Sequence, residues 1–233
     1  MALLSNIETD ESVEDKDSLG GGSNFQPVDS AIYLAKVTMA YSLKSQKGAL
    51  GVYLTLLTED NHEVSEKIFI TAAKDNKKAT FKYPIINSLS LLTAGKDIIE
   101  VSPEEKVVDQ WNFDLKKNIP TKVEMLTELM GKDVYVGIMK VRENKKDYNN
   151  NYAPLAEDRV YNRIDKFFHS TSKLTTVQIK AGQTDPTFFN DWKNKNTGRL
   201  IDEYKPVAAT AASPATSSAP DESAHNIFED ELS

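Results

Sequence analysis

Three segments near the beginning of the chain alternate hydrophobic and polar residues, which is the pattern of β-strands with one buried face. They span residues 32–41, 50–57 and 64–71, and polar turns at 42–49 and 59–62 separate them. The side chains expected to face the core are Tyr33, Ala35, Val37, Met39 and Tyr41, then Leu50, Val52, Leu54 and Leu56, then Val64, Ile68 and Ile70. The pattern therefore predicts a meander of three antiparallel strands.

Apolar residues at helical spacing follow these strands. They predict helices over 84–93 and 122–130, with Gly131 ending the second. Further along the chain, Asp185 and Pro186 are typical of the first positions of a helix. That helix is expected to pack Phe188, Phe189 and Trp192 against the strands.

Alternation returns in two segments, 133–142 and 159–168, which predicts a fourth and a fifth strand. Their core residues are expected to be Val134, Val136 and Ile138, then Val160, Ile164 and Phe168. A loop is expected between them, at 143–158. Three strands, a helical insertion and two strands is the order of an OB-fold, a five-stranded, partly open Greek-key barrel. The fold class is therefore mainly β with a helical insertion, over residues 25–205.

Both ends of the chain differ from this domain in composition. Residues 1–24 are rich in Asp, Glu, Ser and Gly, and 206–233 begin with an Ala/Ser/Thr/Pro stretch, so both are expected to be disordered. The total charge of −7 is divided unevenly, with −5 in each end and +3 in the middle. Because the middle of the chain is mildly basic, it favours binding to a negatively charged partner, although the net charge of the whole chain is negative.

Composition also excludes several kinds of chemistry. The chain has no cysteine, which rules out disulfides and a cysteine nucleophile, and its three histidines have no metal-ligand spacing. No stretch approaches the ~20 apolar residues of a membrane span, and the N-terminus lacks the basic start of a signal peptide. The sequence therefore predicts a cytoplasmic protein without metal or cofactor.

Lysine, arginine and aromatic residues gather where an OB-fold binds oligonucleotides, on strands 2 and 3 and in the loops between strands 1 and 2 and between strands 4 and 5. Single-stranded nucleic acid offers phosphates to cations and base faces to aromatic rings. The candidate residues are Lys44, Lys47, Tyr53, Lys67, Phe69, Lys77, Lys78, Lys82, Tyr83, Lys140, Arg142, Lys145, Lys146, Tyr148, Tyr152, Arg159, Tyr161 and Arg163. The loop sequence KKDYNNNY is the strongest part, because its two lysines and two tyrosines have no core to serve.

Each of these residues also has an ordinary structural interpretation. Outward tyrosines are common on strands, and a pair such as Lys77 and Lys78 is usually only a solvated surface. Phe69 also suits a site beneath the middle section of the chain, and Trp111 suits either the core or a binding surface.

The last eight residues, NIFEDELS, combine apolar and acidic side chains. An exposed aromatic residue beyond a long linker is typical of an anchor for a partner's pocket, with acids steering toward a basic rim. The candidate partner-binding residues are Phe228, Glu229, Asp230, Glu231 and Leu232. A plain solubilising tail is the alternative, and the same acids also suit competition with DNA for the basic domain.

Residues 125–168 and the NIFEDELS tip resemble the single-stranded-DNA-binding proteins of bacteriophages. The resemblance implies an OB-fold that coats single strands in replication and recombination and contacts replication or recombination proteins through its tail. Many members of that family end on the aromatic residue, whereas five residues follow Phe228 here.

Two other classes of function compete with this one. A nuclease or another enzyme is disfavoured, because the chain has no Walker A loop, no G-x-S-x-G and no histidine pair. A protein-interaction or structural module with the same barrel stays open, since a fold does not fix a function. The sequence also leaves open a homodimer and a preference between DNA and RNA.

Overall fold

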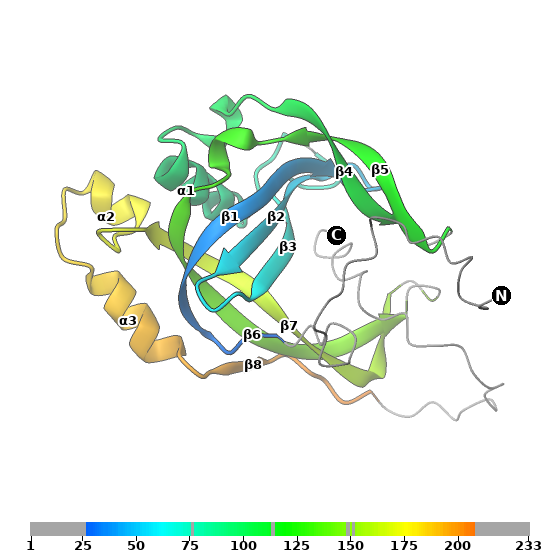
Figure 1. Ribbon diagram of the computed structural model, residues 1–233. Helices are drawn as coiled ribbons and strands as arrows, with labels where there is room; N and C mark the ends of the chain where they lie inside the picture. Colours follow the sequence, from blue (N-terminus) through cyan, green and yellow to red (C-terminus); the bar gives the residue numbers. More distant parts are fainter. Residues whose placement is uncertain (1–26, 76, 113–114, 148–149, 151, 208–233) are drawn as a thin grey trace, which may run out of the picture.

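The computed structural model describes residues 27–75, 77–112, 115–147, 150 and 152–207, and its elements are labelled in Figure 1. The strands are β1 (Ala31–Lys44), β2 (Leu50–Thr58), β3 (Glu63–Phe69), β4 (Glu104–Asn112), β5 (Lys117–Met125), β6 (Asp133–Asp147), β7 (Ala153–His169) and β8 (Leu200–Asp202). The helices are α1 (Tyr83–Thr93), α2 (Thr176–Lys180) and α3 (Thr187–Asn196), with 3-10 helices η1 (Ile98–Glu100) and η2 (Thr127–Leu129). The described chain is mainly β, which confirms that part of the expectation.

The strands of the described residues form one sheet in the order β3-β2-β1-β5-β4, with β6 joined to it through β1. The long β1 has two successive partners, because its first part pairs with β6 and its later residues Tyr41 and Ser42 pair with β5. β7 pairs antiparallel with β6, and β8 pairs parallel with β6. The sheet is open, since no backbone ladder joins β3 to β7 in the described residues, and a closed five-stranded barrel is not confirmed.

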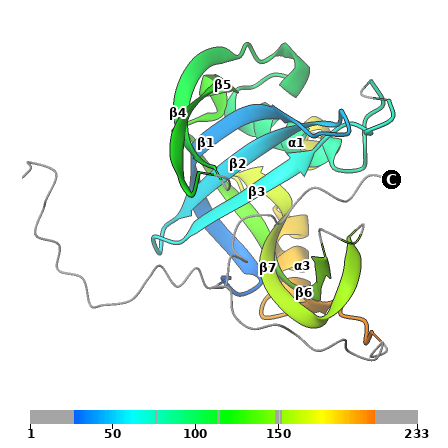
Figure 2. The same cartoon turned by 90° about the vertical axis from the view of Figure 1, so that its right-hand side faces the viewer.

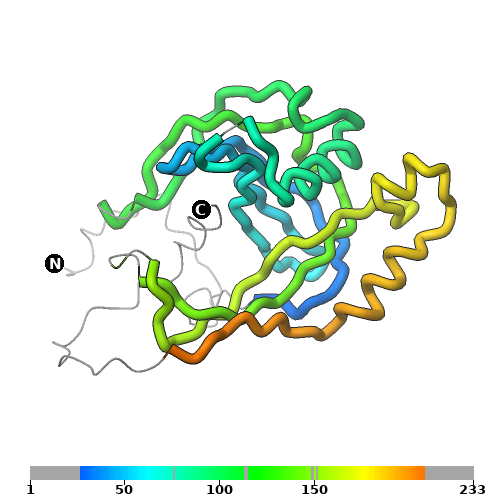
Figure 3. Tube along the Cα trace, turned by 180° about the vertical axis from the view of Figure 1, so that it is seen from behind, coloured from blue at the N-terminus to red at the C-terminus, as the bar shows by residue number. Residues whose placement is uncertain are grey.

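Two β-hairpins project from the same side of the sheet (Figure 1). We call them the β4–β5 arm, residues 104–125, and the β6–β7 arm, residues 143–159. Figure 2 looks at the molecule from that side and shows β1, β2 and β3 between the two arms. Seen from behind in Figure 3, the segment with α2 and α3 lies at the other end of the molecule. In Figure 2 the two arms therefore lie on either side of β1–β3.

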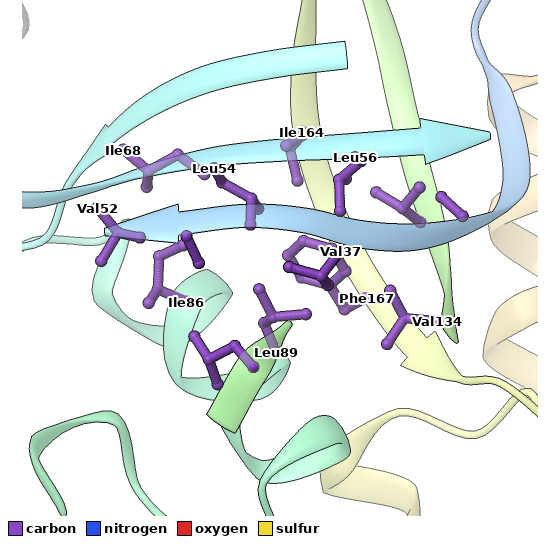
Figure 4. Close-up of a cluster of buried hydrophobic side chains, with 14 of the residues drawn as sticks. Val37, Val52, Leu54, Leu56, Ile68, Ile86, Leu89, Val134, Ile164 and Phe167 are labelled. Carbon is purple, nitrogen blue, oxygen red and sulfur yellow. The ribbon is translucent and has the colours of Figure 1, made fainter. Parts of the chain in front are cut away.

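The main core lies on one face of β1–β3, where α1 covers it. Ile86 and Leu89 of α1 pack against Val37, Leu54 and other buried residues of this cluster, as Figure 4 shows. Burying side chains of this size contributes about 1.5–3 kcal/mol each. Helix α1 thus occupies one face of the three-stranded meander.

Beyond a β-bulge in β1, the prediction of which side chains face the main core is wrong. The register with β2 shifts between Val37 and Met39, so Ala35, Val37 and Ala40 enter the main core. Met39 and Tyr41 then belong to a second cluster with β5 residues, rather than to the face of Val37. Because a bulge inserts one residue into one strand, the two-residue periodicity predicted for 32–41 holds only up to it.

A second bulge, in β7, places Ile164 and Phe168 in different clusters, although the sequence predicts one face for both. The register of β6 with β7 shifts between Gly137 and Ile138, which puts the extra residue of β7 between Ile164 and Lys166. Val160, expected in the core, lies before this bulge and is 39% exposed. Ile164 is buried as expected. Phe168 is buried in a different cluster, with Phe189 and Trp192 of α3. Helix α3 therefore packs where the sequence places it, although Phe188 is exposed.

The prediction of a helix over 122–130 is wrong. Val123 and Met125 are buried while Lys122 and Glu124 are exposed, which is the alternation of β5, and only residues Thr127–Leu129 form a helical turn. The loop expected at 143–158 is also wrong in most of its length, because β6 and β7 extend through it as a hairpin. The helix expected at 84–93 is confirmed as α1.

A buried carboxylate links the two strands that the ladder leaves unjoined. Glu66 of β3 is 2% exposed, and its Oε2 accepts a hydrogen bond of 2.6 Å from the backbone N–H of Ile164 in β7. A buried carboxylate without such a donor is costly, so this bond fixes β3 beside β7.

No helix of the described residues is long and apolar enough to cross a membrane. The expected disordered ends, 1–24 and 206–233, lie outside the described residues except for 206 and 207.

Candidate nucleic-acid interface

The face of β1–β3 opposite α1 carries the predicted residues of strands 2 and 3. Tyr53 lies directly across from Lys67, and Phe69 lies across from Gly51. All three predicted side chains are half-buried. A methyl group at Gly51 would lie 3.0 Å from Phe69 Cδ1, so the ring covers the glycine. We call Tyr41, Tyr53, Lys67 and Phe69 the aromatic face.

Tyr41 supports Tyr53 from below. The two rings are stacked with centroids 4.9 Å apart and planes at 28°. Tyr41 is 8% exposed, and its burial raises the pKa of its phenol to about 12. The neutral hydroxyl accepts a hydrogen bond of 3.1 Å from Nε2 of Gln110, on β4. Aromatic pairs of this kind contribute about 0.5–1.5 kcal/mol beyond burial, so the ring of Tyr53 is held in a fixed plane.

The turn between β1 and β2 meets the tip of the β6–β7 arm. The ammonium group of Lys47 lies 5.8 Å from the centroid of the Tyr152 ring. Tyr152 has a positive φ of 60°, as the turn of the hairpin requires. Two of the residues predicted in separate loops are thus brought together, while Tyr148 lies outside the described residues.

Five of the six predicted cations of β6 and β7, all but Lys146, have a carboxylate partner in the described residues. Arg142 contacts Asp158 and Asp202, and its guanidinium also stacks on Tyr204 at 4.7 Å. The other pairs are Lys140 with Asp29, Lys145 with Glu157, Arg159 with Glu143, and Arg163 with Glu203. Since each of these five cations already has an anionic neighbour, this region carries less free positive potential than the sequence indicates.

Tyr161 does not lie on an outward face. It is 7% exposed and belongs to the cluster of α3, β6 and β7. Its hydroxyl donates to Glu143 at 3.4 Å, and the guanidinium of Arg159 lies 5.2 Å from its ring. No register shift separates Tyr161 from Ile164, so Tyr161 faces away from the main core as alternation predicts, but the cluster that contains Phe189 and Trp192 of α3 covers that side. A buried ring offers no surface for a base to stack on.

The lysine cluster after β3 lies on the way to α1. Lys77 and Lys78 are exposed, and Lys82 immediately precedes the helix. Tyr83 donates a hydrogen bond of 2.6 Å to Oδ1 of Asp97. Burial and this bond raise the pKa of Tyr83 to about 12, while the same bond lowers the pKa of Asp97. The hydrogen bond of Tyr83 therefore links α1 to η1, which is a structural role.

Lys44 and Lys146 stand apart from the aromatic face. Lys44 is exposed at the end of β1, where strand alternation points it to the side opposite Tyr41. Lys146 is half-buried near the tip of the β6–β7 arm, across from Pro154. Of the predicted residues that the structure describes, Tyr53, Lys67 and Phe69 are the ones on the aromatic face.

Sequence reasoning missed the β4–β5 arm altogether. Its signal is present, because Val123 and Met125 continue an alternation that begins at Ile119, but Pro120 and the apolar Leu126 and Leu129 favour a helix after a break. The sequence predicts Tyr41 in the core and indicates no role for Gln110. Trp111, whose role the sequence leaves open, is 44% exposed on β4.

A scan against protein-family models gives no match to this chain, and a search of curated proteins gives none. Among the described residues, no group of three or more acidic or histidine side chains is placed to hold a metal ion. The resemblance to bacteriophage single-stranded-DNA-binding proteins therefore stays a prediction.

Proposed function

We propose that this protein binds single-stranded DNA without sequence preference, with bases stacking on Tyr53 and Phe69 and phosphates contacting Lys67 and Lys47. Stacking on an aromatic ring contributes roughly 1–3 kcal/mol per base and tolerates any base, since every base has a π-face. A cation beside the ring then holds the backbone of the same strand.

The observation that carries this proposal is the arrangement of Tyr53. Its ring is backed by Tyr41 at 4.9 Å, Lys67 is its cross-strand neighbour, and the face is not covered by α1. A ring whose plane is already fixed loses little conformational freedom on binding, which favours affinity.

The strand order supports an OB-fold variant as the scaffold. β2, β3, β6 and β7 join around β1 in the order β3-β2-β1-β6-β7, and α1 lies between β3 and β6 in the chain. In this proposal the side chain of Glu66 links β3 to β7 where an OB-fold closes by strand pairing. The β4–β5 arm is an addition to that scaffold.

The ion pairs of β6 and β7 change how that region contributes. Exposed pairs are worth about 0–1 kcal/mol, so a phosphate can replace a carboxylate at little cost. Each replacement needs the carboxylate to move aside, however. The proposal therefore assigns Lys140, Arg142, Lys145 and Arg163 a secondary role that grows as salt concentration falls, and gives none to Arg159, whose pair with Glu143 is largely buried.

For the C-terminal residues the proposal keeps a role in partner binding. Phe228 and Leu232 would enter a partner's pocket, with Glu229, Asp230 and Glu231 facing a basic rim. The resemblance places such contacts among replication and recombination proteins in an infected cell. In the proposal the protein is a binding protein rather than an enzyme.

The test is a titration with labelled oligo-dT and with duplex DNA of equal length, at low and high salt. A single-strand binder prefers oligo-dT and weakens as salt rises through counterion release. Equal affinity for the duplex, or no binding at low salt, contradicts the proposal and leaves the protein-interaction module.

A further inference from the structure

The inner face of the β4–β5 arm continues the aromatic face. Val108 packs in the cluster that contains Tyr41 and Tyr53, and Gln110 donates its hydrogen bond to Tyr41. Strand pairing places Lys106 across from Val123 and Asn112 across from Lys117. Because paired residues of an antiparallel ladder point to the same side, these side chains lie on the side of Tyr41.

The two faces of the β4–β5 arm differ in charge, because successive residues of a strand point to opposite sides. From Lys106 to Asn112 and from Lys117 to Val123 the inner face carries two lysines, the amides of Gln110 and Asn112, and no carboxylate. The outer face over the same length carries Asp109 and Lys122, together with Val107, Trp111, Asn118 and Pro120. At the base of the arm, Glu104 adds one carboxylate to the inner face, and Glu105 and Glu124 add two to the outer face, so β4 and β5 together carry +1 on the inner face and −2 on the outer face. The inner face is thus the more basic of the two and is rich in hydrogen-bond donors.

The lysines of the inner face are also more exposed than the ion-paired cations of the β6–β7 arm. Lys117 is exposed and has no carboxylate partner within the described ranges, and Lys106 forms one ion pair, with Glu104 at 2.9 Å. Both groups of that pair are more than half exposed, so the pair is weak. On the β6–β7 arm, the Arg159 and Glu143 side chains are only 17% and 16% exposed, so phosphate has poor access to that pair.

We infer that the inner face of the β4–β5 arm is a second segment of the single-strand track, which carries the DNA from Tyr53 past Gln110 toward Asn112 and Lys117. This inference rests on the proposed function. From Lys106 to Asn112 a strand extends about 20 Å at ~3.4 Å per residue, so the arm lengthens the binding surface substantially. A short oligonucleotide fills the aromatic face alone, and a longer one also uses the arm.

The test compares two lengths of labelled oligo-dT, about 5 and about 16 nucleotides, which span the usual range for one OB-fold. The variant is Lys106→Gln with Lys117→Gln, and the matched control is Lys122→Gln, an exposed lysine on the outer face of the same arm. Fluorescence anisotropy is measured over a range of salt concentrations, and circular dichroism checks that each variant folds.

We expect the double variant to bind the long oligonucleotide at least about fivefold more weakly at low salt. Its plot of log K against log salt should be less steep by about 1.4, which is ~0.7 for each of two lost phosphate contacts. The short oligonucleotide should bind all three proteins equally. If the native protein binds both lengths and the double variant behaves like Lys122→Gln, the inference is overturned. If the native protein binds neither length, the proposed function itself fails.

Discussion

Tyr53 is the side chain on which the proposed interface depends most directly. Its ring lies on Tyr41 and beside Lys67, so its orientation is set by the sheet and not by a mobile loop. Tyr41, by contrast, is too buried to meet a base and acts through Tyr53. The two tyrosines therefore have different roles although they are cross-strand neighbours.

Replacing Tyr53 with alanine should weaken oligo-dT binding by ~1–3 kcal/mol, which is roughly 5- to 150-fold, because the stacking surface is lost. Tyr53→Phe keeps the ring and should stay within about twofold of the native protein, since stacking needs no hydroxyl. Phe188→Ala, on α3, is the control for loss of an exposed ring elsewhere. Anisotropy titrations measure all three, and native-like affinity of Tyr53→Ala would remove the aromatic face from the site.

The bond between Tyr83 and Asp97 gives a pH-dependent prediction about stability. The pKa of Asp97 lies below its ordinary value of 3.8 in the folded state, chiefly through this bond. A lowered carboxyl pKa stabilises the fold above the unfolded pKa, and this stabilisation is lost as pH falls through the folded one. Tyr83→Phe should therefore cost about 1 kcal/mol at pH 7, the usual net value of a hydrogen bond, and less at low pH.

Urea denaturation at neutral pH and near pH 2 measures this difference. Asp97→Asn, which cannot ionise, should show a smaller change of stability with pH than the native protein. A Tyr83→Phe variant with the same deficit at both pH values would show that the bond stabilises the fold without acting through the ionisation of Asp97.

At the scale of elements, the packing of α3 on the sheet depends on Gly137. A methyl group there would lie 2.8 Å from Cζ2 of Trp192, whose indole N–H donates to Asp165 at 2.7 Å. Gly137→Ala should therefore destabilise the protein by about 1–3 kcal/mol, the usual cost of overpacking. Combining it with Trp192→Phe, which removes the contacted ring, should cost less than the sum of the single changes. Thermal denaturation of the four proteins tests this, and additive losses would mean that the helix shifts instead of clashing.

The sequence predicts elements well where one period runs without interruption, as in β2, β6 and α1. It fails where a bulge changes the period within a strand, as in β1 and β7, because the extra residue is set by pairing with a neighbour. It also fails for β5, because Met125, the last residue of its alternation, also fits the helical spacing of Leu126 and Leu129 beyond it. Tertiary pairing decides these cases.

At the scale of the whole molecule, the candidate site could be predicted only in part for the same reason. Tyr53, Lys67 and Phe69 share a face because alternation alone fixes it. Whether Arg142 meets a phosphate or a carboxylate depends on residues as distant in the chain as Asp202, which the register of β6 and β8 brings beside it. Net charge over 25–205 therefore overstates the free positive potential of the domain.

The acidic residues after 206 provide the last prediction, because they carry −5 and the body they follow carries +3. Deleting 206–233 should leave oligo-dT affinity unchanged or raise it, since the removed acids compete with phosphates for the same lysines. A full-length variant with Asp221, Glu222, Glu229, Asp230 and Glu231 changed to serine separates charge from chain length and should behave like the deletion. The difference from the native protein should vanish at high salt, where screening ends the competition. Weaker binding by either protein at low salt would mean that this segment contributes to DNA binding and does not oppose it.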